Sequence, residues 1–296
     1  MKPSTESCVI CGNQKFEKKF LCKDHMVSGQ EFGIFECTGC GFRVTLPRPS
    51  TIEIGDYYKS DKYVSHSNQS FGLMSIIYRE VRKLALKGKY RLLKPYLKGE
   101  RVLDIGCGTG AFLSFMQKKG FDVTGVEPDA DARRNALSFY NIHAEDEVFL
   151  STCGAQQFDL ITMWHVLEHV MDLPERIQTI SHILKKDGLL CIAVPNFKSF
   201  DAHYYEKYWA AWDVPRHLWH FSPENISALF SKYGFELIIM HPMKYDAFYV
   251  SILSEKYRGK ALSFLRGCIR GMISNWKAKN GTYSSQIYLL RKKDQN

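Results

Sequence analysis

The stretch VLDIGCGTG at residues 102–110 decides the fold of this chain. Its first half is an apolar run typical of a buried strand, and its second half places glycines at 106, 108 and 110, just before a predicted helix. Glycines are needed where the backbone turns tightly and presents N–H groups to a ligand at a helix N-terminus. The stretch therefore predicts a strand, a ligand-binding loop and a helix in succession.

Outward from this loop, short apolar runs alternate with helical segments. Strands are predicted at 101–105, 123–126, 158–163, 189–194 and 236–240, with a last one at 286–290. Helices are predicted at 111–119, 131–139, 173–184 and 223–233. Strands that are separated by helices pair in parallel through crossover connections. The expected fold class is α/β, with a Rossmann-like sheet.

Two carboxylates indicate which ligand the glycine loop binds. Glu127 ends the next predicted strand, where a carboxylate can accept hydrogen bonds from both ribose hydroxyls of an adenosine. The spacing Gly106-x-Gly108-x-x-Ala111 also fits a dinucleotide, so an NAD-dependent oxidoreductase stays an alternative. Asp104 would repel a pyrophosphate but would pair with an ammonium group. A ligand with an adenosine and a free amino acid is S-adenosylmethionine (SAM).

The chain resembles the class I SAM-dependent methyltransferases. Four blocks carry the resemblance, at 102–110, 123–129, 158–170 and 184–196. It implies a seven-stranded sheet whose last strand inserts antiparallel. It also implies a cofactor site in which glycines wrap the methionine part, one carboxylate supports its amino end, another holds the ribose and an indole lines the cofactor. These residues are Gly106, Gly108, Gly110, Asp104, Glu127 and Trp164, in that order.

Two cysteine pairs predict a metal site near the N-terminus. Cys8-x-x-Cys11 and Cys37-x-x-Cys40 are each followed by a glycine, and four thiolates in this arrangement form a closed, structural zinc site. Cys22-x-x-His25 lies between the pairs and could replace one of them. This zinc-ribbon-like head resembles that of deoxysugar C-methyltransferases and, less closely, that of ribosomal RNA guanine methyltransferases. An RNA methyltransferase therefore stays an alternative.

The expected domain organisation has three consecutive parts. Residues 1–50 form the zinc-knuckle module and 51–98 a helical cap and linker. Residues 99–296 form the methyltransferase domain, with a basic helical insertion at 242–284. The insertion includes an amphipathic stretch at 255–279, which is expected either to pack on its own domain or to contact a membrane surface.

The motif His165-x-x-Glu168-His169 matches a zinc-peptidase pattern. Its place directly after a predicted strand argues against a peptidase, and the segment resembles the one that follows the fourth strand in ubiquinone-type O-methyltransferases. Some of those relatives place a divalent metal there. Structural hydrogen bonding, proton transfer by His165 and metal binding remain open.

The segment 203–221 holds seven aromatic residues and three histidines. It follows the fifth predicted strand, where open parallel sheets form their binding crevice, and it resembles a loop of bacterial methyltransferases with polysaccharide and envelope functions. His217 and His220 are candidate bases, as is His165 of the preceding motif. Arg216 is a candidate anion contact, and Asp213 is expected to orient a histidine.

Composition excludes several classes of protein. The 296 residues are 45% apolar and 24% charged, which is typical of a soluble globular protein. No apolar run approaches the ~20 residues of a membrane span, and the first residues lack the apolar core of a signal peptide. Nine cysteines without an export signal argue against a disulfide framework. The expected location is the cytoplasm.

Charge is distributed unevenly along the chain. The net charge is +9, with +5 at 51–100 and +8 at 251–296, but −6 at 101–250. Basic flanks around an acidic centre favour a small anionic acceptor over a long nucleic-acid footprint. A sugar or lipid-linked glycan intermediate is the expected acceptor.

Overall fold

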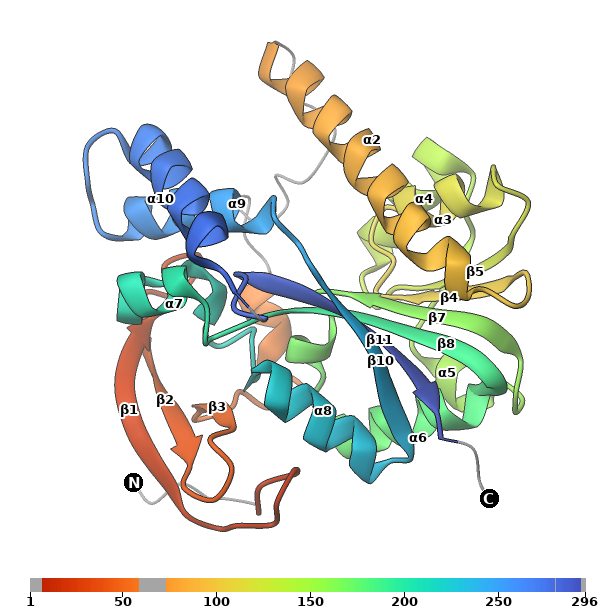
Figure 1. Cartoon of the computed structure of the whole chain (residues 1–296), viewed down its shortest axis with the longest axis horizontal. Coiled ribbons are helices and arrows are strands. Elements are labelled where there is room, and N and C mark those ends of the chain that lie inside the picture. The colour runs from red at the N-terminus through yellow and green to blue at the C-terminus, as the bar shows by residue number, and fades with distance from the viewer. Residues whose placement is uncertain (1–6, 59–72, 280, 294–296) are drawn as a thin grey trace. The chain divides into compact units, whose positions relative to one another are not determined.

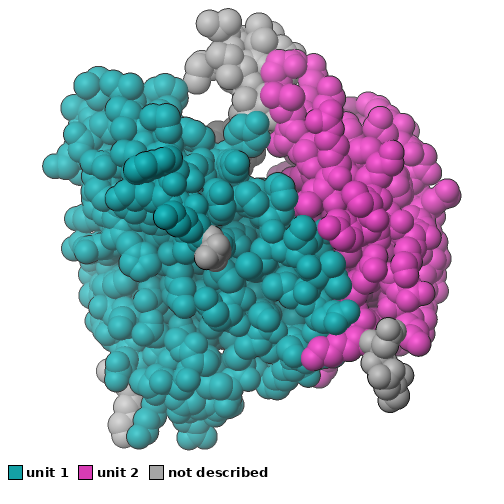
Figure 2. All heavy atoms as spheres, viewed as in Figure 1, with its two compact units in different colours: residues 1–63, 165–176, 192–289 teal, residues 64–164, 177–191, 290–296 magenta. Residues whose placement is uncertain are grey.

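The computed structural model describes residues 7–58, 73–279 and 281–293. The chain forms two compact units, each built from separate stretches of sequence (Figure 2). Unit 1 comprises 1–63, 165–176 and 192–289, and unit 2 comprises 64–164, 177–191 and 290–296. Each unit combines several stretches of the chain, whereas the sequence analysis divided the chain into consecutive domains at 1–50, 51–98 and 99–296. That division stays a prediction.

Unit 2 contains the parallel strands that the glycine stretch predicted (Figure 1). Strand β4 (Arg101–Ile105) pairs in parallel with β5 (Asp122–Val126) and with β7 (Phe158–Trp164), and β5 pairs with β6 (Ala144–Glu145). The register sets Asp104 opposite Gly125 on one side and Thr162 on the other. The parallel register therefore brings the carboxyl ends of β4, β5 and β7 to one edge of the sheet.

The complete sheet has seven strands in the order β10-β11-β8-β7-β4-β5-β6. The three strands not yet placed are β8 (Leu184–Pro195), β10 (Phe235–Pro242) and β11 (Ser285–Lys292). The last strand in the sequence, β11, thus lies between β10 and β8 in the sheet order. The α/β, Rossmann-like fold predicted from the sequence is confirmed.

The helices include the four that the sequence predicted at 111–119, 131–139, 173–184 and 223–233, each with ends within two residues of the prediction. The first five are α2 (Leu73–Leu93), α3 (Ala111–Gln117), α4 (Ala130–Tyr140), α5 (Val148–Thr152) and α6 (Leu173–Ile183). They are followed by α7 (Phe200–Tyr205) and α8 (Pro223–Lys232). Helix α8 begins with a capping box, in which Ser222 and Asn225 satisfy each other's backbone N–H groups.

The N-terminal cysteine segment belongs to a second, four-stranded sheet in unit 1. Strands β1 (Phe16–Lys23), β2 (Glu31–Cys37) and β3 (Arg43–Leu46) are antiparallel neighbours. The fourth strand, β9 (Trp219–His220), pairs with β3 through Arg43↔His220 and Val44↔Trp219. The aromatic segment 203–221 is therefore tied to the cysteine module by strand pairing.

The basic insertion consists of two helices where the sequence suggested one amphipathic stretch at 255–279. Helix α9 (Asp246–Tyr257) ends before Gly259, and α10 (Ser263–Lys277) starts after Leu262. Both turn residues have positive φ angles, 65° and 55°, which a right-handed helix does not accommodate. Among the described residues, we find no helix whose length and apolar character would suffice to cross a membrane.

Candidate functional site

Three glycines shape the loop between β4 and α3. Gly106, Gly108 and Gly110 have φ angles of 70°, 54° and 77°, a left-handed conformation that costs other residues free energy. A Cβ atom at Gly108 would meet no atom within 4 Å. The loop therefore leaves open space beside its backbone at the N-terminal end of α3.

Asp104 lies on β4 directly below this loop. Its side chain is buried, and its Oδ1 accepts a hydrogen bond of 2.5 Å from Thr162 Oγ1. Burial raises the pKa of the Asp104 carboxyl to about 7, although Thr162 and the positive charge of Lys89 act to lower it. A buried carboxylate at this place favours a positively charged ligand group.

Glu127 follows β5 and connects to the glycine loop. Its Oε2 accepts a hydrogen bond of 2.8 Å from the Gly108 N–H, and its Oε1 accepts one of 3.0 Å from the Asp129 N–H. Each carboxylate oxygen keeps a second lone pair. Burial raises the pKa of Glu127. The carboxylate is held rigidly and can still accept hydrogen bonds from two ligand hydroxyls.

Trp164, the last residue of β7, contributes an aromatic ring to the candidate site in unit 2. Its ring packs edge-on against Phe112, with centroids 5.4 Å apart, and the Lys89 Nζ lies 3.7 Å from its centroid. The indole Nε1 is buried without a hydrogen-bond partner among the described residues. Lys89 comes from α2, and our sequence analysis did not single it out, because a basic cap helix gives no signal for one particular lysine.

These residues fit SAM better than a dinucleotide. Gly106, Gly108, Gly110, Asp104, Glu127 and Trp164 all belong to unit 2. An ionised Asp104 would repel a pyrophosphate bound at this loop, but it would pair with the ammonium group of an amino acid. The Nε1 of Trp164 can still donate a hydrogen bond to a ligand, and the space beside Gly108 can hold part of one.

The four predicted cysteine ligands come together in unit 1. Cys8 Sγ lies 3.6 Å from Cys40 Sγ, and Cys11 Sγ lies 3.5 Å from Cys37 Sγ. All four sulfurs lie within 4.8 Å of one another. Tetrahedral zinc with Zn–S bonds of ~2.3 Å places its sulfurs about 3.8 Å apart. The separations between these sulfurs are compatible with a closed tetrahedral zinc site.

The four thiols differ in how easily they lose their protons. Although burial acts to raise it, the amide N–H groups of Gly39 and Cys40 lower the pKa of the Cys37 thiol, whereas burial raises the pKa of the Cys8 and Cys40 thiols. The alternative pair is placed elsewhere, because Cys22 belongs to the apolar core of unit 1 and His25 stacks on Tyr257 with ring centroids 4.2 Å apart. Neither joins the four-sulfur group.

The histidine motif begins at the first residue after β7. His165 has a positive φ of 56°, and its two ring nitrogens contact carboxylates on either side, Nε2 at 2.8 Å from Asp246 and Nδ1 at 3.3 Å from Glu168. Although burial opposes it, these carboxylates raise the pKa of His165 to about 10. His165 is therefore protonated at neutral pH and positions Glu168.

Glu168 is the centre of a second group of potential metal ligands. Ligand atoms of Glu168, His169 and His217 lie within 4.8 Å of one another. Glu168 is buried, and its Oε2 has no hydrogen-bond partner among the described residues. Although burial opposes it, His165 holds the pKa of Glu168 below its usual range. The group thus combines a buried carboxylate with two imidazoles and could hold a divalent cation or a proton.

Among the three histidines predicted as bases, His217 has the most suitable surroundings. Its Nδ1 lies 2.9 Å from the Ala211 carbonyl oxygen, to which it must donate, so Nε2 is the acceptor of the neutral ring. His220 is buried, its Nε2 lies 2.9 Å from Thr45 Oγ1, and burial lowers its pKa well below the usual range. His220 therefore also serves the packing of β9 on β3.

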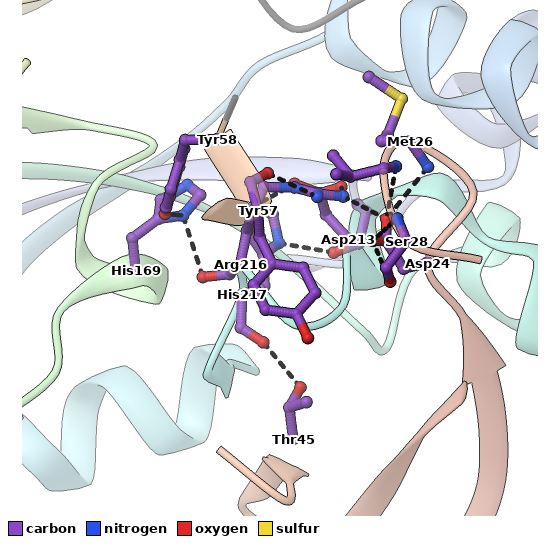
Figure 3. A network of polar contacts seen from close by, with 12 residues as sticks. Asp24, Met26, Ser28, Thr45, Tyr57, Tyr58, His169, Asp213, Arg216 and His217 are labelled. Atoms are coloured by element: carbon purple, nitrogen blue, oxygen red, sulfur yellow. Dashed lines mark hydrogen bonds and ion pairs between the residues drawn. The ribbon is translucent and has the colours of Figure 1, made fainter. Parts of the chain in front are cut away.

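Arg216 and Asp213 form a buried network instead of facing outward (Figure 3). The guanidinium donates to both carboxylate oxygens of Asp213, at 2.6 and 3.0 Å, and to Asp24 at 3.1 Å. A further N–H donates to the Tyr57 carbonyl oxygen at 3.0 Å. Two carboxylates thus neutralise the residue that we expected to contact an anion. Asp213 mainly orients Arg216, since its Oδ2 lies 3.9 Å from His217 Nε2.

Removing the guanidinium from this network should destabilise unit 1. Arg216→Met leaves Asp24 and Asp213 without their partner, and we expect the free energy of unfolding to fall by about 3–5 kcal/mol, measured by urea denaturation. Arg134→Met, at an exposed pair with Asp131, should cost less than about 1 kcal/mol. Equal losses in the two variants would contradict the role of the network.

Comparisons with known proteins support the sequence-based expectation. Residues 77–239 match the family model described as "Methyltransferase domain". An Actinobacillus pleuropneumoniae protein named "Ubiquinone biosynthesis O-methyltransferase" is 39% identical over 111 residues, which are 34% of this chain and 47% of that protein. A Coxiella burnetii protein of the same name is 34% identical over 127 residues, which are 40% and 52% of the two chains. The chain spans about half the length of these curated relatives.

Solved structures agree on the fold. A SAM-dependent methyltransferase from Archaeoglobus fulgidus is similar with a TM-score of 0.50 and 21% identity, over 75% of this chain and all of the other. A geranyl diphosphate C-methyltransferase from Streptomyces coelicolor is similar with a TM-score of 0.51 and 13% identity, over 79% and 86% of the two chains. At these identities the likeness concerns the fold alone.

Proposed function

Since the chain belongs to the methyltransferase-domain family, we propose that it transfers the methyl group of SAM to a small anionic acceptor. The observation that carries the proposal is the cofactor set at the ends of β4, β5 and β7. It offers a carboxylate for an ammonium group, a carboxylate for ribose hydroxyls and an aromatic face. Family membership argues against the oxidoreductase alternative.

The cofactor residues have separate tasks in this proposal. SAM, when bound, supplies a methyl group that its positively charged sulfonium has activated. Asp104 would pair with the amino end of the methionine part, and the glycine loop would enclose that part. Glu127 would accept hydrogen bonds from the ribose. We expect Lys89 to meet the carboxylate end, and Trp164 to cover the cofactor with its ring.

Glu127→Ala should weaken SAM binding about 10- to 100-fold, because hydrogen bonds to a charged acceptor contribute ~1.5–3 kcal/mol. Isothermal titration calorimetry measures this, with Glu175→Ala on an exposed carboxylate of α6 as the matched control. NAD should not bind. An unchanged SAM affinity in Glu127→Ala, or tight NAD binding, would refute the cofactor assignment.

The affinity for SAM should also depend on pH near neutrality. Because burial raises the pKa of Asp104 to about 7, its carboxyl is largely neutral at lower pH and cannot pair with an ammonium group. SAM affinity should therefore increase as the pH rises through about 7, by up to about tenfold per pH unit below it. Asp104→Asn should bind weakly and lose this dependence, and titrations between pH 5.5 and 8.5 measure it.

His217 is our leading candidate for proton removal from the acceptor. Its Nε2 is the free acceptor nitrogen, and the negative charges of Glu168 and Asp213 both interact with its ring. They would stabilise the imidazolium that forms when a hydroxyl loses its proton. His220 and His165 remain candidates, although His165 is already protonated.

The composition of the segment that carries His217 bears on our proposal for the acceptor class. Segment 203–221 is rich in tyrosine and tryptophan and contains one lysine and one arginine; Arg216 is neutralised within the protein. Its tryptophans, Trp209, Trp212 and Trp219, are buried, so the segment offers an RNA strand neither a row of cations nor exposed stacking platforms. A sugar or a lipid-linked glycan intermediate remains our proposed acceptor. An intermediate of ubiquinone biosynthesis is the second candidate, favoured by the relatives' name.

Methyl-labelled SAM identifies the acceptor class. Purified protein is incubated with cell extract, which is then separated into water-soluble metabolites, lipids, quinones, protein and RNA. Label in the sugar or glycolipid fractions supports the proposal, and label in the quinone fraction supports the second candidate. Label confined to RNA would favour a ribosomal RNA methyltransferase instead.

We further propose that Cys8, Cys11, Cys37 and Cys40 bind one structural zinc ion per chain. The separations between their sulfurs support this. Four protein ligands leave no position for substrate or water, so the ion would hold the N-terminal sheet together and take no part in methyl transfer.

A further inference from the structure

Helix α10 turns an apolar stripe to the solvent. Residues three and four apart share one face of a helix, and here that face carries large apolar side chains. Leu265, Met272 and Trp276 are 55%, 59% and 79% exposed. Within α10 the stripe consists of Leu265, Ile269, Met272 and Trp276, and Leu262, in the turn just before the helix, is also exposed.

The opposite face of α10 is buried, and this keeps the apolar stripe turned to the solvent. Gly267 and Gly271 are buried against α9, which lies beside α10 in Figure 1, and Ser274 is buried and donates a hydrogen bond to Asp201 of α7. A Cβ atom at Gly267 would lie 2.5 Å from Ile252 Cα, and one at Gly271 would lie 2.8 Å from Phe248 Cα. Only glycine permits this approach, so α10 cannot turn its apolar stripe inward.

Cations border the stripe along one side. Arg266, Arg270 and Lys277 lie on the helix between the stripe and the buried face. Arg270 and Lys277 rest on the rings of Tyr204 and Phe200, at 4.2 and 4.5 Å from their centroids. Arg266 pairs with the buried Glu255 at 3.1 Å. Between residues 256 and 293 the chain has ten lysines and arginines and no acidic residue.

This charge pattern selects the partner. In a second copy of the chain, the stripe would bring Arg270 and Lys277 of both copies together. Glu255 is buried and already paired with Arg266, so it cannot offset these cations, which disfavours self-association. Anionic lipid headgroups complement the cations, and the acyl boundary accommodates leucine, methionine and tryptophan. We propose that α10 binds the surface of an anionic membrane, with the stripe inserted at the headgroup boundary. This inference does not depend on the proposed function.

Trp276 provides a direct signal for the test. Trp209, Trp212 and Trp219 are buried, and the partly buried Trp164 packs on Phe112 in unit 2, so insertion should alter mainly the emission of Trp276. The full chain is mixed with vesicles of phosphatidylcholine, with or without phosphatidylglycerol. We expect co-sedimentation, a blue shift and quenching by brominated acyl chains with the anionic vesicles only. Trp276→Phe should lose most of this optical change and still co-sediment.

Matched variants separate the apolar and charged contributions. Leu265→Gln/Met272→Gln and Arg270→Gln/Lys277→Gln should each weaken vesicle binding about tenfold or more. The controls are Val148→Gln, at an exposed apolar residue of α5, and Lys18→Gln/Lys118→Gln, at exposed lysines elsewhere. Absence of binding to anionic vesicles, or equal weakening by the controls, would overturn the proposal. So would a dimer in sedimentation velocity that Leu265→Gln/Met272→Gln dissociates.

Discussion

The variant Cys8→Ser/Cys37→Ser is expected to purify without zinc and to melt about 10 °C or more below the parent chain. It removes one ligand from each pair, and the remaining two thiols cannot close a tetrahedral site. Structural zinc contributes ~10–16 kcal/mol to the folding of small zinc modules. In a domain of this size each kcal/mol corresponds to ~2–4 °C in Tm. Elemental analysis and calorimetry measure the two effects.

The same variant should affect the two functional sites differently. Strand β3 of the zinc module pairs with β9, and Thr45 of β3 donates to the His217 carbonyl oxygen at 2.7 Å. Turnover should therefore fall, whereas SAM affinity should remain, since the cofactor residues belong to unit 2. Cys22→Ala/His25→Ala is the control that keeps the zinc. Loss of zinc in that control would show that our ligand set is wrong.

The second large effect is expected at the proposed base. His217→Ala should lower kcat about 10²- to 10⁴-fold, the usual contribution of a positioned acid or base. The SAM dissociation constant should change little. Initial rates with labelled SAM and calorimetry on the same sample separate the two.

Two further histidine variants make this test specific. His143→Ala, at an exposed residue, should have no effect on kcat. His220→Ala should chiefly lower Tm, because it removes a buried ring that contacts Thr45 and packs on Trp212. If His220→Ala lost more turnover than His217→Ala at equal stability, the role of base would pass to His220.

The central sheet was predictable because its signals are local. The predicted strand 101–105 coincides with β4, and 158–163 differs from β7 by one residue. In contrast, β8 begins at Leu184, five residues before the prediction, since exposed polar residues occupy its start. The N-terminal strands were not predicted, because a short polar segment without alternation gives no period. Strand β9 has two residues and exists only through its distant partner.

The residues of the candidate site also differ in whether a local sequence pattern predicts them. The glycines, Asp104 and Glu127 lie in contiguous motifs, so the sequence was sufficient to single them out. Arg216 was expected to face an anion, yet its partner Asp24 lies 192 residues away in the sequence. A buried ion pair between distant segments leaves no local pattern. Lys89 was not predicted for the same reason, because it contacts Trp164 of a distant segment.

The pairing of β3 with β9 has a consequence for synthesis on the ribosome. Thr45 and His217, which bond across these segments, are 172 residues apart. At ~5–20 residues per second, about 9 to 34 s pass between their translation. During that interval the edge of β3 has no strand to pair with, and open strand edges favour aggregation. The last cysteine of the knuckles, Cys40, is made before β3, so zinc can close the module early. We therefore expect the yield of folded protein to depend on the zinc available while the chain is being translated.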